Sequence, residues 1–214
     1  MPAVGSESEI LTAMGTSGAP GIAEEDLLRA NCYGLLVSAL LAPPSGELLD
    51  TFKGLDGDET PFGKAMSALG ELARTTKPDD VTDEFTRLFY GHGAGGELHP
   101  YASFYLTGFV YDRPLALLRD DLIALGLTKS DVTSEPEDHI AFMMNVMHDL
   151  IVGAHGASKD LAAQKDFFDK HVAPWATVFF ENLEAAENAK FFRPVGTIGK
   201  LLMEIEGQAF SIAA

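Results

Sequence analysis

The fold class is indicated most clearly by residues 136–155, which read PEDHIAFMMNVMHDLIVGAH. In this stretch apolar side chains recur at intervals of three and four residues, at Ile140, Met143, Met144, Met147, Leu150 and Ile151. An α-helix places such positions on one face, whereas a half-buried strand alternates apolar and polar residues. Glycines at positions 153 and 156 end the pattern, as they commonly do after a helix. The stretch therefore predicts an amphipathic helix with one buried face.

The same spacing extends in both directions along the chain. It predicts helices at Glu24–Leu41, from Ser45, at Pro61–Thr75, Thr82–Phe89, Pro114–Leu125, Pro136–His155 and Ser158–His171, from Pro174, and around Ile198–Ile205. No stretch alternates convincingly with a period of two. We therefore expect an all-α fold of about nine or more helices packed in a single globular helical-bundle domain. Residues 126–135 are the expected connection between two helical layers.

The chain is strongly acidic. Its 214 residues include 15 Lys and Arg against 32 Asp and Glu, a formal net charge of −17, and 46% of the residues are hydrophobic. This hydrophobic fraction is sufficient to fill a core. A surface with this charge repels nucleic-acid phosphates and anionic lipids but attracts cationic peptides. Nucleic acids and membrane surfaces are therefore poor candidate partners.

Residues 1–21 are expected to form a flexible tail ahead of a helical domain at residues 22–214. They lack the basic start and the apolar run of a secretory signal. No apolar stretch of the sequence approaches the roughly 18 residues that suggest a membrane span. Cys32 is the only cysteine, so an internal disulfide is excluded, and its place on an apolar helical face predicts a buried core residue. Together these features predict a cytoplasmic protein.

The signatures of common catalytic sites are missing. The sequence contains no Gly-x-Ser-x-Gly elbow, no phosphate loop ending in Gly-Lys-Ser/Thr and no His-Glu-x-x-His motif. The glycine-rich residues 91–96 follow a predicted helix rather than a strand, which favours a plain loop over a phosphate cradle. His92 and His99 lie in or beside that loop, and His148 and His155 have no cysteine pair nearby. We therefore predict no enzyme activity, no metal site and no cofactor.

Two segments leave functional alternatives open. Five aromatic residues crowd positions 101–111, where they either pack in the core or line a groove; they are Tyr101, Phe104, Tyr105, Phe109 and Tyr111. Residues 135–139 read EPEDH, and acidic residues around a proline suit the first turn of a helix. Alternatively these residues form a polar cluster at a layer junction, where Asp138 and His139 face a cleft and hold a peptide.

Several short blocks follow one another in a defined order along the chain. They are EFTRLFYG at residues 84–91, PYASFYL at 100–106, Leu118-Arg119 followed by Gly126, EPEDH at 135–139, and His171, Pro174-Trp175 and Phe179. In these blocks the chain resembles the TorD/DmsD-like family of redox-enzyme maturation chaperones, which is related to the NarJ type. The resemblance extends over about residues 24–210. The chain departs from the family pattern beside the predicted groove, at Gly91-His92, His99-Pro100 and Leu106-Thr107. The resemblance therefore identifies the family more firmly than the client protein.

The resemblance implies a cytoplasmic chaperone for a molybdopterin-containing oxidoreductase. Such a chaperone binds the twin-arginine signal peptide or the immature catalytic subunit of its client until the cofactor is inserted. The implied partners are the molybdoenzyme catalytic subunit and its leader peptide, and a monomer and a domain-swapped dimer are both compatible with the family. The family's Glu-Pro-x-Asp-His motif lies between two helical subdomains and is implicated in client recognition. The expected peptide-binding residues are Glu135, Pro136, Glu137, Asp138, His139, Leu88, Tyr101, Phe104 and Tyr105.

Other function classes make different predictions. A NarJ-like assembly factor would bind the body of the client rather than its leader. A nucleotide-binding or hydrolysing protein would use Asp138 and His139 as an acid–base pair, and its turnover would vanish in His139→Ala. A permanent structural subunit of a redox complex would purify together with the mature enzyme.

Overall fold

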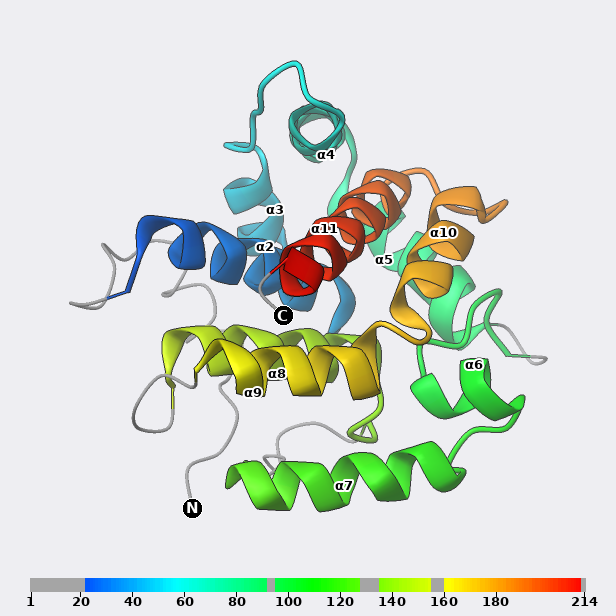
Figure 1. The fold of residues 1–214 in the computed structure, drawn as a ribbon. Helices are drawn as coiled ribbons and strands as arrows, with labels where there is room; N and C mark the ends of the chain where they lie inside the picture. Colours follow the sequence, from blue (N-terminus) through cyan, green and yellow to red (C-terminus); the bar gives the residue numbers. More distant parts are fainter. Residues whose placement is uncertain (1–21, 92–94, 128–134, 155–159, 213–214) are drawn as a thin grey trace. The chain divides into compact units, whose positions relative to one another are not determined.

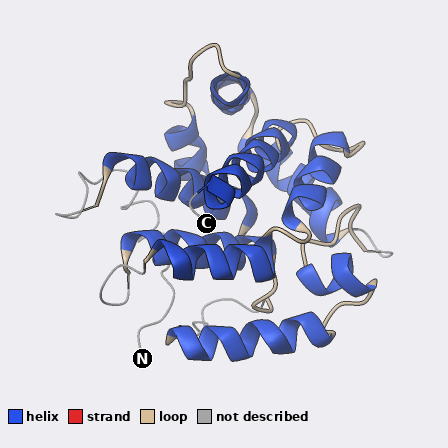
Figure 2. Cartoon of the chain, in the orientation of Figure 1, coloured by secondary structure: helices blue, strands red, loops and turns tan. Residues whose placement is uncertain are grey.

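The computed structural model describes residues 22–91, 95–127, 135–154 and 160–212. Within these ranges the chain is helical and contains no strand, which confirms the expected all-α fold (Figure 1, Figure 2). Its α-helices are α2 (Glu24–Leu40), α3 (Gly46–Phe52), α4 (Pro61–Thr75), α5 (Pro78–Phe85), α6 (Ala102–Thr107), α7 (Arg113–Leu125), α8 (Ile140–Val152), α9 (Leu161–Phe167), α10 (Ala176–Ala185) and α11 (Arg193–Ile212). The π-helical segments η1 (Thr86–Tyr90) and η2 (Phe168–Val172) continue α5 and α9. None of the described helices is both long and apolar enough to cross a membrane.

The helices group into two compact units, each made from two separate stretches of chain. Unit 1 consists of Met1–Leu41 and Tyr101–Trp175, and unit 2 of Ala42–Pro100 and Ala176–Ala214. Of the layer connection expected at residues 126–135, residues 128–134 are outside the described part, so this connection stays a prediction. The tail expected at residues 1–21 is also outside the described part.

Helix α8 is the centre of unit 1. Helix α2 packs along it, and α9 and η2 contact it as well (Figure 1). Residues on every side of α8 are buried, including Phe142, Asn145 and Val146, which lie outside the predicted apolar stripe. A helix that is apolar on all sides needs partners on all sides. The single buried face predicted from the spacing is therefore too narrow, because α8 is a core helix.

Helix α11 organises unit 2. Helix α10 packs along it, α4 contacts it, and α3 packs against α4. The core of this unit is rich in phenylalanine, with Phe179, Phe180, Phe191, Phe192 and Phe210 almost completely buried. Gly196 and Gly199 allow α11 to approach α10 closely, since a Cβ at either position would collide with that helix. The absence of two side chains thus sets the packing of α10 on α11.

A buried carboxylate joins the two stretches of unit 2. Glu84 in α5 accepts hydrogen bonds from the backbone N–H groups of Lys190 and Phe192, at 2.7 and 2.9 Å. Glu84 is only 5% exposed. Charge-assisted hydrogen bonds from two N–H groups offset part of the desolvation of this carboxylate. They fix the segment before α11 to α5.

Three helix starts differ from the predicted ones. A helix was expected from Thr82, but α5 begins at Pro78, because the first turn of a helix does not need the N–H that proline lacks. Pro136 was expected in the first turn of a helix, whereas α8 begins only at Ile140. Ser158, the expected N-cap of the next helix, is outside the described residues. Asp160 caps α9 by accepting the N–H of Ala163 at 2.8 Å.

Candidate functional site

The EPEDH segment at residues 135–139 precedes α8 instead of forming its first turn. His139 is the N-cap, and its Nδ1 accepts the backbone N–H of Ala141 at 3.2 Å. The backbone N–H of His139 donates to the carbonyl of Pro136 at 3.1 Å. These two hydrogen bonds form a turn that leads into α8. The prediction that the acidic residues cap their own helix is therefore wrong, because a histidine has that role.

Asp138 caps a different helix. Its Oδ2 accepts the backbone N–H of Ser103 at 2.9 Å, and its carbonyl accepts that of Ala102 at 3.0 Å. Both N–H groups belong to the first turn of α6, where no partner within the helix exists. Next to them Tyr101 and His139 form an isolated antiparallel β-bridge. Asp138 therefore stabilises the start of α6 from 35 residues along the chain.

The carboxylate of Asp138 is almost completely enclosed. Asp138 is 1% exposed and Ser103 is fully buried. Asp138 Oδ1 and Ser103 Oγ have no hydrogen-bond partner among the described residues. A buried polar atom without a partner destabilises a fold by about 1–3 kcal/mol. The contact between the EPEDH segment and α6 therefore has a defined geometry but contributes only moderately to the stability of the fold.

His139 is uncharged at neutral pH. Burial lowers the pKa of its imidazole from 6.5 to about 3, because the charged form is poorly solvated there. Since Nδ1 accepts a backbone hydrogen bond, the ring proton is assigned to Nε2. The ring of Tyr101 packs edge-on against the imidazole at a centroid distance of 5.4 Å. This arrangement holds the segment in place and offers solvent no imidazole for acid–base chemistry.

The two glutamates of the segment are closer to the surface and are each engaged. Tyr101 donates its hydroxyl hydrogen to Glu135 Oε2 at 2.7 Å. Arg119 on α7 donates to Glu137 Oε2 through Nε and Nη2, at 3.0 and 2.7 Å. This bond to Glu137 raises the pKa of the Arg119 guanidinium, which keeps its charge.

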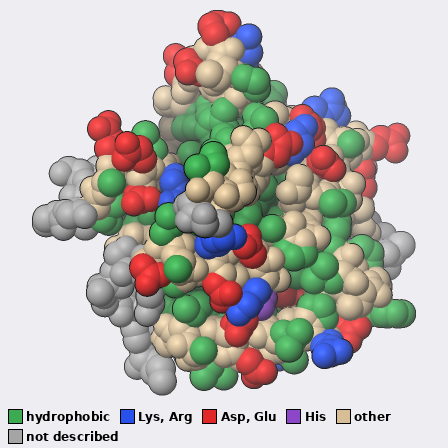
Figure 3. All heavy atoms as spheres, in the orientation of Figure 1, with side chains coloured by type: hydrophobic (Ala, Val, Ile, Leu, Met, Phe, Trp, Pro, Cys, Tyr) green, Lys and Arg blue, Asp and Glu red, His purple; other side chains and the backbone are tan. Residues whose placement is uncertain are grey.

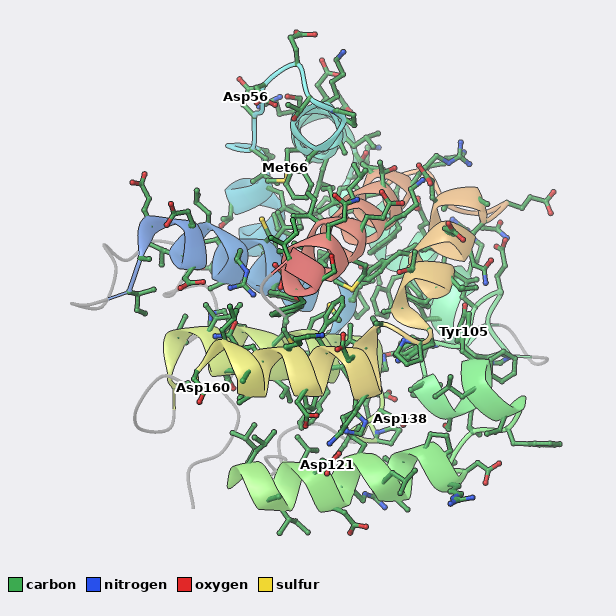
Figure 4. All side chains as sticks on the ribbon, viewed as in Figure 1. Asp56, Met66, Tyr105, Asp121, Asp138 and Asp160 are labelled. Carbon is green, nitrogen blue, oxygen red and sulfur yellow. The ribbon has the colours of Figure 1, made fainter. Side chains whose placement is uncertain are left out.

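Helix α7 has a second attachment at Asp121, two residues beyond Arg119. His171 Nε2 and Asp121 Oδ2 are 2.8 Å apart, and the His171 carbonyl accepts the indole N–H of Trp175 at 2.8 Å. Figure 4 shows Asp121 on the inward side of α7, with Asp138 nearby and Tyr105 on α6. Polar side chains therefore fix α7 within unit 1 at two points.

The aromatic residues at positions 101–111 divide into two groups. Tyr101, Phe104 and Tyr105 are half-buried, and the ring of Tyr105 packs on Trp175 at a centroid distance of 5.4 Å. Phe109 and Tyr111 follow in the connection to α7 and are both 71% exposed. Core packing thus applies to part of the cluster, and a groove lined by these aromatic residues stays a prediction.

The predicted peptide-binding residues are not all accessible. Tyr101, Phe104, Tyr105, Glu135 and Glu137 are half-buried, whereas Pro136, Asp138 and His139 are buried, and all of them belong to unit 1. Leu88 belongs to unit 2 and is fully buried in η1. Peptide contact by any of these residues stays a prediction.

Ser103 and Arg119 were missed as members of this cluster. Ser103 takes part through its backbone N–H, which leaves no signal in a sequence. Arg119 is a cation within an acidic chain, and it stands in the Leu118-Arg119 block already noted, so that block was an available signal.

No group of three or more His, Cys, Asp or Glu side chains suited to a metal ion occurs in the part of the chain that the structure describes. His148 Nδ1 lies 3.0 Å from Asp149 Oδ1, and His92 and His155 are outside the described residues.

The thiol of Cys32 is half-buried, less enclosed than predicted. In the glycine loop, Gly91 has a positive φ of 71°, and a Cβ there would collide with the carbonyl of Gly95. A glycine is needed at position 91 because the backbone of Gly95 approaches it closely.

Comparison with known proteins places the chain in a family. Residues 55–181 match the model of the nitrate reductase delta subunit family. The chain belongs to this family. The motif-based recognition is confirmed, since relatives with TorD and DmsD names match 64% and 56% of the chain.

The curated relatives match this chain over different lengths and at different sequence identities. Two Vibrio cholerae proteins named chaperone protein TorD are 35% identical. One matches over 109 residues, 48% of this chain and 49% of the relative, and the other over 149 residues, 64% and 67%. The chain thus spans about half the length of the first of them. A Haemophilus influenzae protein named as the Tat proofreading chaperone DmsD is 28% identical over 123 residues, 56% of each protein.

The fold of this family member also matches a solved structure. A crystal structure of a candidate redox enzyme maturation protein from Archaeoglobus fulgidus aligns with a TM-score of 0.54 and 17% identity. The alignment covers 83% of this chain and 94% of that chain. At this identity the likeness establishes the fold alone.

Proposed function

We propose that this chain is a cytoplasmic chaperone that matures a molybdopterin-containing oxidoreductase and catalyses no reaction itself. It holds the twin-arginine leader or the immature catalytic subunit until the cofactor is inserted. Family membership and the TorD and DmsD names of its relatives support the role in maturation. The observation that carries the proposed site is the attachment of the EPEDH segment to α6, which places half-buried carboxylates beside half-buried aromatic rings.

This surface suits a ligand that is both basic and apolar. The half-buried carboxylates of Glu135 and Glu137 belong to the same unit as the half-buried rings of Tyr101, Phe104 and Tyr105. A twin-arginine leader combines paired guanidinium groups with an apolar segment of about 7–15 residues. Guanidinium groups form strong hydrogen bonds with carboxylates, and aromatic faces bind both apolar groups and cations. The two parts of the ligand therefore have matching surfaces on one unit.

Burial divides the predicted residues into two roles. The half-buried Glu135, Glu137, Tyr101, Phe104 and Tyr105 contact the peptide. The buried Pro136, Asp138 and His139 position them, because they fix the turn, the start of α6 and the Tyr101 bridge. Leu88 contributes to the core of unit 2.

Calorimetric titration with a synthetic twin-arginine leader tests the proposal. The wild-type chain should bind with a Kd in the micromolar range or tighter, and affinity should fall when salt is raised. A leader with Arg-Arg→Ala-Ala is the matched control and should bind at least about tenfold more weakly, since paired charge-assisted hydrogen bonds are lost. Equal affinity for both leaders would exclude recognition of the arginine pair.

Binding of the client body is a second candidate, favoured by the name of the family itself. A delta subunit of nitrate reductase denotes a partner of the enzyme. Capture of an immature catalytic subunit from which the leader has been deleted distinguishes the two modes. Full capture without the leader would assign recognition to the client body, and loss of capture would assign it to the leader.

A further inference from the structure

The end of α6 and its connection to α7 expose several large apolar side chains. Phe109 and Tyr111 are each 71% exposed, and Leu106 and Val110 are exposed as well. We call these residues the apolar tip. Apolar side chains are visible over this connection in the space-filling view (Figure 3). Contiguous exposed apolar residues commonly mark interaction sites, whereas single ones need no explanation.

The apolar tip is held in a defined conformation. Gly108 ends α6 in the left-handed region, with its N–H donating to the Phe104 carbonyl at 2.8 Å. The Thr107 hydroxyl donates to the Ser103 carbonyl at 2.8 Å and accepts the Phe109 N–H at 3.3 Å. These contacts fix the backbone before a partner arrives. Preorganisation lowers the entropy lost on binding.

The backbone of the apolar tip is also strained. Tyr111 has a φ of 61°, the only positive φ of a non-glycine residue among the described residues. A residue with a side chain costs roughly 1–2 kcal/mol in this conformation. Since Tyr111 is mostly exposed, packing within the chain offsets little of that energy. Strain of this kind is found mainly at binding and active sites.

We infer that the apolar tip binds the apolar segment that follows the arginine pair of a client leader. This inference rests on the proposed function. The carboxylates of the candidate site lie at the N-terminal end of α6 and the apolar tip at its C-terminal end, about 9 Å apart at 1.5 Å per helical residue. A few extended peptide residues cover that distance. Asp112 and Arg113 beside the tip cancel in formal charge, so the tip favours uncharged residues, whereas the opposite end favours cations.

The test compares two leaders on two proteins. The variant is Phe109→Ser with Tyr111→Asn, because asparagine tolerates the left-handed conformation. The second leader keeps its arginines but has its apolar segment replaced by Ser, Gly and Asn. We expect the variant to bind the natural leader at least about tenfold more weakly than the wild type does, as removal of two aromatic contacts requires. For the polar leader, the two proteins should have equal affinity.

Leu28→Ser is the control, because Leu28 on α2 is 60% exposed and lies outside the apolar tip. It should leave both affinities unchanged, and the urea midpoint of the tip variant should match that of the wild type. An unchanged affinity of the variant for the natural leader would overturn the inference alone. An equal loss for both leaders would overturn it too, because the effect would not concern the apolar segment.

Two further outcomes separate this inference from other readings. If the wild-type chain binds no leader at all, the leader-binding part of the proposed function fails and the inference fails with it. If light scattering shows a wild-type dimer that the tip variant dissociates, with leader affinity unchanged, the tip is a contact between copies of this chain. That result would overturn the assignment to a leader.

Discussion

A single buried carboxylate connects the EPEDH segment with the aromatic surface. Asp138 accepts the N–H of Ser103 at the start of α6, which carries Phe104 and Tyr105. Its effect on binding is therefore expected to be indirect. The sequence hypothesis had Asp138 facing a cleft, whereas the residue is buried. Its partner lies 35 residues away and leaves no local signal in the sequence.

Substitutions at Asp138 separate hydrogen bonding from charge. Asp138→Ala should lower the free energy of unfolding by about 1–3 kcal/mol, since the Ser103 N–H loses its partner in a buried place. Asp138→Asn retains an acceptor for that N–H and should lower it by less than about 1 kcal/mol. Urea denaturation monitored by circular dichroism measures both values. Equal destabilisation by the two variants would mean that the charge, not the hydrogen bond, matters.

His139 makes stability depend on pH in a defined window. Its pKa is about 3 in the folded chain against 6.5 for an unperturbed histidine, so the unfolded chain binds more protons between these values. The contribution of His139 is complete above pH 6.5 and is lost as the pH falls toward 3. In that window the contribution of His139 to the free energy of unfolding should fall by up to about 1.4 kcal/mol per pH unit.

The comparison variant for this titration is His139→Asn. Asparagine caps helices well and can accept the Ala141 N–H, but it does not titrate. Urea denaturation of both proteins at several pH values isolates the histidine, since the carboxylates contribute to both. Parallel curves for the two proteins between about pH 4 and pH 6.5 would contradict a buried neutral imidazole.

At the scale of elements, the packing of α11 on α10 depends on missing side chains. A Cβ at Gly196 would lie 2.5 Å from the backbone nitrogen of Glu184, and backbone cannot rotate away. Gly196→Ala should therefore lower the free energy of unfolding by at least about 1–3 kcal/mol. Gly46→Ala at the start of α3 meets nothing within 4 Å and should change it by less than about 1 kcal/mol. A Gly196→Ala protein as stable as the wild type would show that the two helices can separate without loss.

The positions of most helices could be predicted from the sequence, but the segments that pack against each helix could not. The periodic spacing predicted α2, α4 and α7 to within one residue at their ends, because each has the apolar positions of an amphipathic helix. Residues 136–139 were predicted as helix but pair with Tyr101 and the start of α6 instead. That competition involves segments about 35 residues apart and has no local signal. Burial of α8 on every side depends on partners for the same reason.

For the whole molecule, the net charge of −17 should control how quickly a basic leader is captured. Long-range attraction raises association rates and is screened beyond about 10 Å at 0.1 M salt. Raising the salt from about 20 mM to about 300 mM should slow association roughly tenfold and change dissociation much less. Stopped-flow fluorescence with a labelled leader measures both rates. A salt effect confined to dissociation would indicate short-range ion pairs alone.

The hydrogen bonds of Glu84 have a consequence for biosynthesis. Their donors, Lys190 and Phe192, lie 106 and 108 residues further along the chain. When α5 leaves the ribosome, the partners of its buried carboxylate have not yet been translated. At about 5–20 residues per second they follow some 5–20 seconds later. Unit 2 can therefore complete its fold only after residue 192 has been synthesised, and a nascent chain stalled before residue 190 should remain sensitive to protease in residues 42–100.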